Sequence, residues 1–125
     1  MAISADQIAT LEHILNEKYA KENLRFKMSV HFVRDRINDP RNTPAITLTE
    51  LQGIFFRLTS IHLGKLLKVK HGETFNVRCK TSHINIPCAM SKSMTPGSKE
   101  QSEVIAITVM RKKDFKAKDE LEFLV

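Results

Sequence analysis

The residues best suited to acid–base chemistry gather in one stretch, residues 29–42, with the sequence SVHFVRDRINDPRN. These fourteen residues include one histidine, three arginines, two aspartates and two asparagines. Histidine changes charge near neutral pH and can act as base or acid, and arginine binds phosphate oxygens through paired hydrogen bonds. His31 with Arg34 or Arg36 can therefore supply the base and the phosphate clamp for metal-free cleavage of RNA.

Cleavage of RNA through its 2′-OH needs several groups in one place. A base removes the 2′-OH proton, an acid protonates the leaving 5′ oxygen, and cations stabilise the charge that develops at phosphorus. Residues elsewhere in the chain that can bind phosphate or supply the acid are Arg78, Lys80, His83, Arg111 and Lys112. Arg41, near the end of the first stretch, is assigned to RNA binding. The spacing of these residues in the sequence leaves open which of them share one site.

The same side chains also fit a purely structural interpretation. His31 can bond to Asp35, four residues later on a helix, and such pairs stabilise helices by about 0.2–0.5 kcal/mol. The arginines can form exposed ion pairs with Asp35 and Asp39, which are common and weak. Asn38 and Asn42 then form only the helix end and the turn. The other basic residues that can be ordinary solvent-facing positions of a strand or tail are Arg78, His83, Arg111 and Lys112.

Other kinds of catalytic site find little support in the sequence. The five histidines are scattered and none has another histidine four residues away, so we expect no metal site. The chain has only four glycines, no glycine-rich phosphate loop and no nucleophile-elbow motif. Cys79 and Cys88 fall on the apolar side of a predicted hairpin, which favours inert core thiols. We therefore expect neither a metal ion nor a cofactor.

The composition favours a small globular protein with a polyanionic partner. The chain has 125 residues, 42 % of them hydrophobic, which suits a single domain, 1–125, with one core. Its net charge of +6 favours nucleic acid over a membrane, although a basic surface can also serve solubility alone. No apolar run is long enough to cross a bilayer, and the N-terminus does not resemble a secretion signal. We expect a cytoplasmic protein whose cysteines are kept reduced.

The stretch that carries His31 is predicted to form a short helix over residues 30–38. Ser29 is a suitable N-cap, and Pro40 cannot continue a helix. The apolar positions at helical spacing are Val30, Val33 and Ile37. The polar positions that share another face of this helix are His31, Arg34, Asp35 and Asn38.

Two longer helices are predicted on either side of it, because capping boxes occur at residues 4–7 and 47–50. The first helix is predicted to run to about Lys21, and the second to end or bend at Gly64. Residues 24–28 alternate between apolar and polar side chains, which predicts a short strand after the first helix.

The C-terminal half changes from helical to alternating periodicity, which predicts a β-hairpin with its turn at residues 81–82. In this hairpin Val77 faces Ile86 on the apolar side. A polar loop is expected over residues 91–102, followed by a central strand, 103–110, that is covered on both faces. The order of elements predicts an α+β domain with helices on one side of a small antiparallel sheet.

At HFVRDRINDPRN, from His31 to Asn42, the chain resembles a group of small bacteriophage proteins of unassigned role. The segments ITLTEL, INIP and TVMRKKDF are similar as well and follow in the same order. A histidine-and-arginine helix followed by an antiparallel sheet is also similar, more distantly, to the phage branch of the RelE, barnase and colicin-type ribonuclease fold. This resemblance implies a RelE-like architecture and a metal-independent endoribonuclease.

In that family the site would contain His31 and an arginine. The resemblance also implies that three further residues face the same cleft as His31, namely Thr108, Arg111 and Lys112. Arg34 follows His31 by three residues and Arg36 follows it by five, where the family pattern has four. The identity of the phosphate clamp therefore stays open.

We predict an RNA-directed protein, with metal-independent endoribonuclease as the first hypothesis. The alternative is a non-catalytic module that binds RNA or a host protein through the same basic face. A structural role, as a virion component or assembly factor, is a third possibility.

Overall fold

The computed structural model describes residues 2–125. Its helical segments are α1 (Ala5–Lys18), η1 (Ala20–Glu22), η2 (Phe32–Arg36) and α2 (Leu48–Leu67). Its strands are β1 (Leu24–Met28), β2 (Thr74–Cys79), β3 (Ile84–Met94), β4 (Glu100–Ala106), β5 (Met110–Arg111) and β6 (Glu122–Leu124). Both predicted capping boxes are present, at the starts of α1 and α2. Within the described residues, no helix combines the length and the apolar character needed to span a bilayer.

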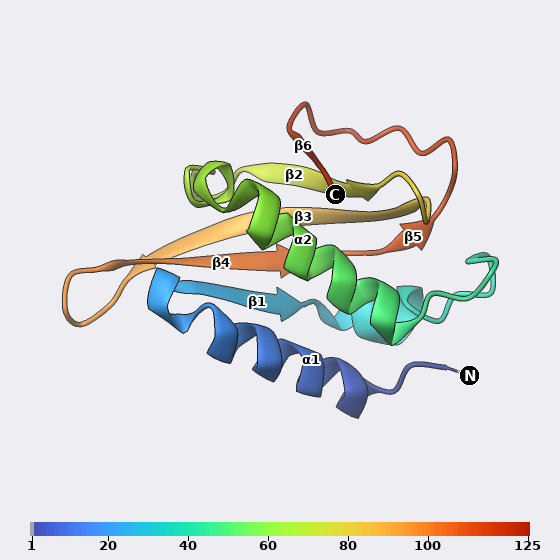
Figure 1. The fold of residues 1–125 in the computed structure, drawn as a ribbon, viewed down its shortest axis with the longest axis horizontal. Coiled ribbons are helices and arrows are strands. Elements are labelled where there is room, and N and C mark those ends of the chain that lie inside the picture. The colour runs from blue at the N-terminus through green and yellow to red at the C-terminus, as the bar shows by residue number, and fades with distance from the viewer. Residues whose placement is uncertain (1) are drawn as a thin grey trace.

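The strands form one mixed sheet in the order β1-β4-β3-β2-β6, and β5 pairs with the start of β3. β1 runs parallel to β4, and β6 runs parallel to β2. The prediction of a wholly antiparallel sheet is therefore wrong at both edges, because alternation identifies a strand but does not set the direction of its partner. α1 and α2 lie on the same face of the sheet, as the order of elements predicted (Figure 1).

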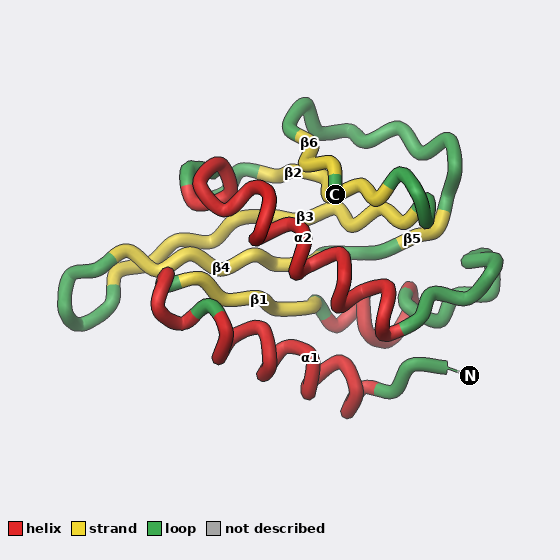
Figure 2. The backbone as a smooth tube through the Cα atoms, viewed as in Figure 1, coloured by secondary structure: helices red, strands yellow, loops and turns green. Residues whose placement is uncertain are grey.

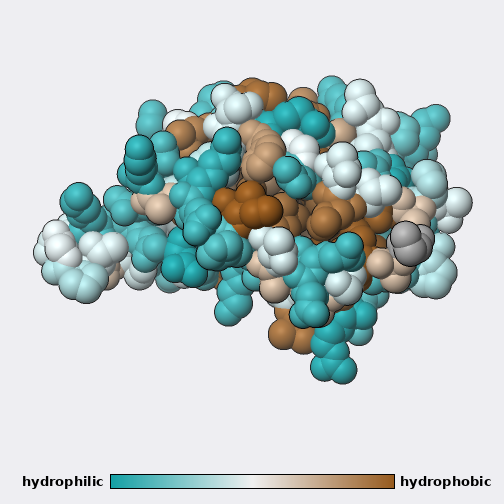
Figure 3. Space-filling model, turned by 60° about the horizontal axis from the view of Figure 1, so that its bottom comes forward, coloured by the Kyte–Doolittle hydropathy of each residue, from teal (hydrophilic) through white to brown (hydrophobic). Residues whose placement is uncertain are grey.

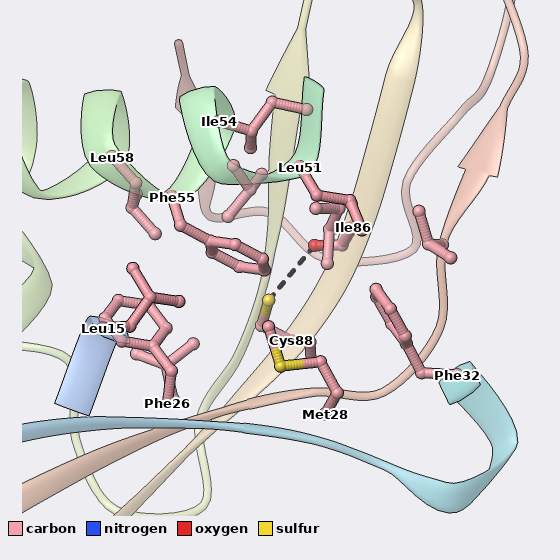
Figure 4. Packing of buried hydrophobic residues seen from close by; sticks show 14 of the residues in the cluster. Leu15, Phe26, Met28, Phe32, Leu51, Ile54, Phe55, Leu58, Ile86 and Cys88 are labelled. Atoms are coloured by element: carbon pink, nitrogen blue, oxygen red, sulfur yellow. Dashed lines mark hydrogen bonds between the residues drawn. The ribbon is translucent and has the colours of Figure 1, made fainter. Parts of the chain in front are cut away.

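The hydrophobic core lies between the two long helices and the sheet. α1 contributes Ile8, Leu11 and Leu15, and α2 contributes Leu51, Ile54, Phe55 and Leu58. The ring of Phe55 meets the ring of Phe26 edge-on at a centroid distance of 5.3 Å, beside the Cys88 thiol (Figure 4). Burying one such large apolar side chain contributes about 1.5–3 kcal/mol. In the view of Figure 3, hydrophilic side chains surround a smaller exposed apolar area.

The β2–β3 hairpin has the predicted register. Val77 pairs with Ile86 and Arg78 pairs with Asn85, so apolar and polar side chains fall on opposite faces. The apolar face packs into the core, where Val77 and Ile86 are fully buried. The alternation of the sequence therefore sets which side chains of β2 and β3 reach the other face of the sheet.

The β3–β4 hairpin differs from its prediction. The expected polar loop over residues 91–102 is mostly strand, because β3 and β4 continue as a two-stranded ribbon that projects from the sheet (Figure 1). The strand expected to be covered on both faces buries only one: Val104 and Ala106 are buried, whereas Ile105 is partly exposed. The reason is that both long helices cover the same side of the sheet.

The edge strand β1 is protected by side chains of α1. Asn16 Oδ1 accepts a hydrogen bond from Phe26 N (2.7 Å), and Asn16 Nδ2 donates one to Phe26 O (3.3 Å). Glu12 accepts a hydrogen bond from Met28 N (2.6 Å). Open backbone groups at a sheet edge invite pairing with another chain, so these side chains take the place of the missing strand.

Replacing Asn16 with leucine is expected to lower the free energy of unfolding by about 1–3 kcal/mol, because the backbone N–H and C=O groups of Phe26 both lose their partner. The exposed edge is also expected to promote self-association. Urea unfolding and light scattering measure the two effects. His13→Leu on the exposed side of α1 is the matched control, and equal stability of the two variants would contradict the protective role of Asn16.

α2 bends before the glycine that was predicted to end or bend it. His62 departs from helical geometry (φ −122°, ψ 16°), and the helix then continues through Gly64 to Leu67. His62 Nε2 lies 2.8 Å from Leu124 O, and its ring packs against Phe123 at 5.3 Å between centroids. The bend therefore occurs where the helix meets β6.

Candidate nucleic-acid interface

The segment that carries His31 is a π-helical turn rather than the predicted α-helix. Ser29 caps it as predicted, accepting a hydrogen bond at Oγ from Phe32 N (3.0 Å). Ile37 N then donates to Phe32 O (2.9 Å), a spacing of five residues that defines the π-helix. This wider turn buries Phe32 and Ile37 but leaves Val30 67 % exposed, so the predicted apolar face is wrong at Val30.

The π-helical spacing brings Arg36 beside His31. Arg36 Nε donates to His31 Nε2 (2.9 Å), and His31 Nδ1 lies 3.2 Å from an Asp35 carboxylate oxygen. Because arginine can only donate, Nε2 is the acceptor and Nδ1 carries the proton that bonds to Asp35. The imidazole is 45 % exposed. Arg34 is exposed and forms no side-chain hydrogen bond or ion pair with the residues that the structure describes, so Arg36 is the arginine that accompanies His31.

The loop after the π-helical turn is fixed by Asp39 and Asn42. Asp39 accepts hydrogen bonds from Arg41 N (2.9 Å) and from the Nε and one Nη of Arg41. These bonds from Arg41 hold the pKa of Asp39 at about 2. Asn42 Nδ2 donates to Arg36 O (3.0 Å), and Asn42 Oδ1 accepts from Arg111 N (2.9 Å). The loop therefore ties the π-helical turn to β5.

Arg111 is an internal link between three segments. Its guanidinium donates to Pro44 O (2.7 Å), Ser82 O (2.8 Å), Ala45 O (3.1 Å) and Glu50 Oε1 (2.7 Å). The side chain is only 8 % exposed. Four of the five N–H donors of an arginine are thus occupied within the protein. We assign Arg111 to positioning the surrounding cleft, in place of the phosphate contact or acid expected from the sequence.

The pKa of Glu50 reflects this link. Burial raises the pKa of its carboxyl group, but hydrogen bonds from Arg111 and from Thr47 lower the pKa by more than burial raises it. The pKa of Glu50 therefore lies below its usual value. Glu50 also belongs to the capping box of α2, so the same carboxylate serves the helix start and Arg111. The loop, the β2–β3 turn and the start of α2 are consequently joined at one point, and they lie at the same end of the molecule (Figure 2).

A cationic cleft of about 350 Å³ lies beside this link. Arg36 and Arg41 line it from the π-helical turn and its loop, and Lys112 lines it from the chain after β5. His31 does not line the cleft, but it is hydrogen-bonded to Arg36, which does. The structure therefore brings Lys112 beside Arg36 and Arg41, from which it is far apart in the sequence. Arg41 and Lys112 were predicted to bind RNA, and Arg36 was a candidate for the phosphate clamp.

Two further clefts continue the positive surface. The second, about 480 Å³, shares Lys112 with the first, and the third, about 460 Å³, shares His83 and Lys113 with the second. We call the continuous surface formed by the following residues the basic strip: Arg36, Arg41, Lys80, His83, Lys112 and Lys113. Lys113 was not among the residues assigned to RNA contact from the sequence, although it directly follows Lys112.

Arg78 lies under the strip and is largely internal. Its guanidinium binds Glu122 (2.9 Å) and donates to Phe115 O (2.8 Å), and its side chain is 19 % exposed. Burial raises the pKa of Glu122, but hydrogen bonds from Arg78 and Asn76 lower it below its usual value. Arg78 thus anchors the chain that follows β5, in place of the direct RNA contact expected from the sequence.

Thr108 does not line any of the three clefts of the basic strip. The resemblance implied that it faces the same cleft as Arg111 and Lys112. It lines instead an apolar cavity of about 420 Å³ with Phe115 and Pro87. Between β4 and β5 the chain leaves the ladder at residues 107–109, which directs Thr108 toward this cavity.

The two cysteines occupy the core side of the β2–β3 hairpin, and both are buried. Burial raises the pKa of Cys88. Burial also raises the pKa of Cys79, but the hydrogen-bonding groups of Ser82 and Thr81 outweigh it and lower the pKa to about 7. Cys79 also belongs to the lining of the second cleft.

Within the described part of the chain, no three metal-binding side chains come close enough to hold an ion. Comparison of the chain with protein-family models, curated proteins and solved structures finds no match. The arrangement of its own residues is thus the basis for assigning a function.

Proposed function

We propose that the protein binds RNA through the basic strip. The observation that carries this proposal is the continuity of the three clefts, which share lining residues and have more basic than acidic side chains, so a sugar–phosphate chain can follow them. The acidic residues of the lining are Asp39, Glu50, Asp114 and Glu122. Lys80, Lys112 and Lys113 form no ion pair with any residue from 2 to 125. Their ammonium groups are therefore available to phosphates.

The two arginines of the strip add directional contacts. Asp39 occupies the Nε and one Nη of Arg41, which leaves the second Nη of Arg41 for a phosphate oxygen. Arg36 lines the first cleft and bonds to His31 through Nε, and its two Nη groups have only a 3.8 Å contact to Asp39. Arginine forms paired hydrogen bonds with phosphate oxygens, so these groups set where the RNA backbone sits.

The double substitution Lys112→Gln and Lys113→Gln tests the proposal. We expect RNA affinity to fall, because two phosphate contacts are lost, and the slope of log K against log salt to decrease by about two. Fluorescence anisotropy with a labelled single-stranded RNA over a range of salt concentrations measures both quantities.

Lys65→Gln with Lys68→Gln is the matched control, because both lysines are exposed at the end of α2 and the net charge changes equally. If the control lowers affinity as much as the strip variant does, the attraction is spread over the whole surface and the proposal is wrong.

A second candidate function, metal-independent cleavage of the bound RNA, is favoured by the position of His31. Its exposed imidazole is oriented by Asp35, and its Nε2 is held by Arg36, which lines the first cleft. If the guanidinium of Arg36 bonds to a phosphate instead of to His31, Nε2 of His31 becomes free to accept the 2′-OH proton. The test is cleavage of labelled RNA in EDTA by the wild type and by His31→Ala.

A further inference from the structure

An apolar cavity of about 420 Å³ lies next to the basic strip and has no role in the function proposed above. It forms between the sheet face opposite the long helices and the chain that follows β5. Thr74 hydrogen-bonds to Asp119, and Asn76 N donates to Leu121 O (3.1 Å), so this chain is fixed across β2. The cavity is therefore part of the folded structure.

Two contacts connect this cavity with the basic strip. Met110 lines both the cavity and the first cationic cleft. Arg78, which lines the second cleft, donates to Phe115 O and lies 5.9 Å from the centroid of the Phe115 ring. A polymer bound along the strip would thus pass residues that also form the wall of the cavity.

The lining of the cavity suits a flat aromatic group with polar edges. Phe115, Met110 and Ile107 provide apolar and aromatic surface, and the volume lies within the range of ordinary ligand pockets. Thr108 Oγ1 forms no hydrogen bond with any described residue, and neither do the backbone N–H groups of residues 116–117. These groups can therefore bond to the edge of a base.

The charge around the cavity matches the same ligand. Lys116 and Lys118 line it, and Lys112 and Lys113 precede Phe115 in the chain. Two lysines thus line the cavity together with Asp119, and two more lysines and Asp114 lie in the same segment of the chain. Aromatic rings among cations are the usual surface for single-stranded nucleic acid, where bases stack and phosphates bind nearby.

We propose that the cavity takes one unstacked base of the RNA bound on the basic strip, which makes the protein selective for single strands. The inference rests on the proposed RNA binding. In a duplex every base is paired and stacked, so none can enter the cavity without breaking the helix. A single strand loses little when one base turns out of the stack.

The first experiment compares a single-stranded RNA with a duplex of the same sequence and length by fluorescence anisotropy. We expect the wild type to bind the single strand about tenfold more tightly. Phe115→Leu keeps an apolar side chain but removes the aromatic face, and it is expected to bring the single-strand affinity down toward that of the duplex. Phe56→Leu, at a partly buried ring on α2, is the matched control and is expected to keep the preference. Thermal unfolding verifies that both variants are folded.

The second experiment separates the cavity from the strip by using adenosine and uridine, which carry no phosphate. We expect saturable amide chemical-shift changes at Thr108, Phe115 and residues 116–118. Such shifts without any RNA binding would refute the strip as an RNA site while supporting the base cavity. RNA binding without single-strand preference and without nucleoside shifts would overturn the inference alone. Equal shifts with benzoate would also overturn it, because the cavity would then accept any apolar ring.

Discussion

Replacing Arg111 with methionine is expected to lower the free energy of unfolding by about 3–5 kcal/mol, the range for breaking a buried ion pair from one side. Methionine keeps the length of the side chain but removes every donor. Glu50 then loses its charged partner, and the carbonyl groups of Pro44, Ala45 and Ser82 lose theirs. Urea unfolding followed by circular dichroism measures the change.

Lys112→Met is the matched control, since the neighbouring lysine is exposed and forms no ion pair with any described residue; its effect is expected to stay within about 0.5 kcal/mol. The pH dependence gives a second check. The pKa of Glu50 is lower in the folded protein, so its ion pair stabilises the fold above the usual pKa of 4.5. The difference between Arg111→Met and wild type should therefore be largest at neutral pH and shrink as the pH falls below 4.5. A constant difference would contradict the ionic role of Arg111.

If the bound RNA is cleaved, His31→Ala is expected to lower the cleavage rate by about 10²- to 10⁴-fold, the usual contribution of a positioned general base. The RNA affinity is expected to change little, because the proposed phosphate contacts lie on the basic strip. The measurement is single-turnover cleavage of labelled RNA in EDTA, with the affinity determined separately by anisotropy.

His13→Ala is a close control, because His13 pairs with Glu17 four residues later (3.1 Å), as His31 pairs with Asp35, but it lies on α1. Comparing Arg36→Gln with Arg34→Gln identifies the clamp, and only Arg36→Gln is expected to slow cleavage. Retarded but intact RNA with the wild type would show a binding protein without catalysis. Cleavage that persists in His31→Ala would assign the chemistry to another residue.

Much of the fold could be predicted from local patterns. The β2–β3 register follows from strict alternation, because shifting the pairing by one residue would place Arg78 in the core. The starts of α1 and α2 follow from their capping boxes. The parallel edge strands could not be predicted, because β1 and β6 are short and their partners are chosen by tertiary packing.

Less of the candidate site than of the fold could be predicted from the sequence. A π-helical turn was not apparent in the sequence, although it decides that Arg36, and not Arg34, meets His31. The role of Arg111 could not be predicted either. Three of its four acceptors are backbone carbonyls, which every residue type has, so the sequence does not identify them. Asn38, expected only to end the helix, bonds to both backbone groups of Ile3.

The contact that Arg111 makes with three separate segments has a consequence for recognition. The loop, the turn and the helix start are already immobilised relative to one another before any ligand arrives, so complex formation costs little conformational entropy. A preorganised surface of this kind cannot reshape itself around different polyanions. If the protein binds RNA as proposed, discrimination then depends on whether the path of the RNA backbone matches the fixed spacing of the cationic groups.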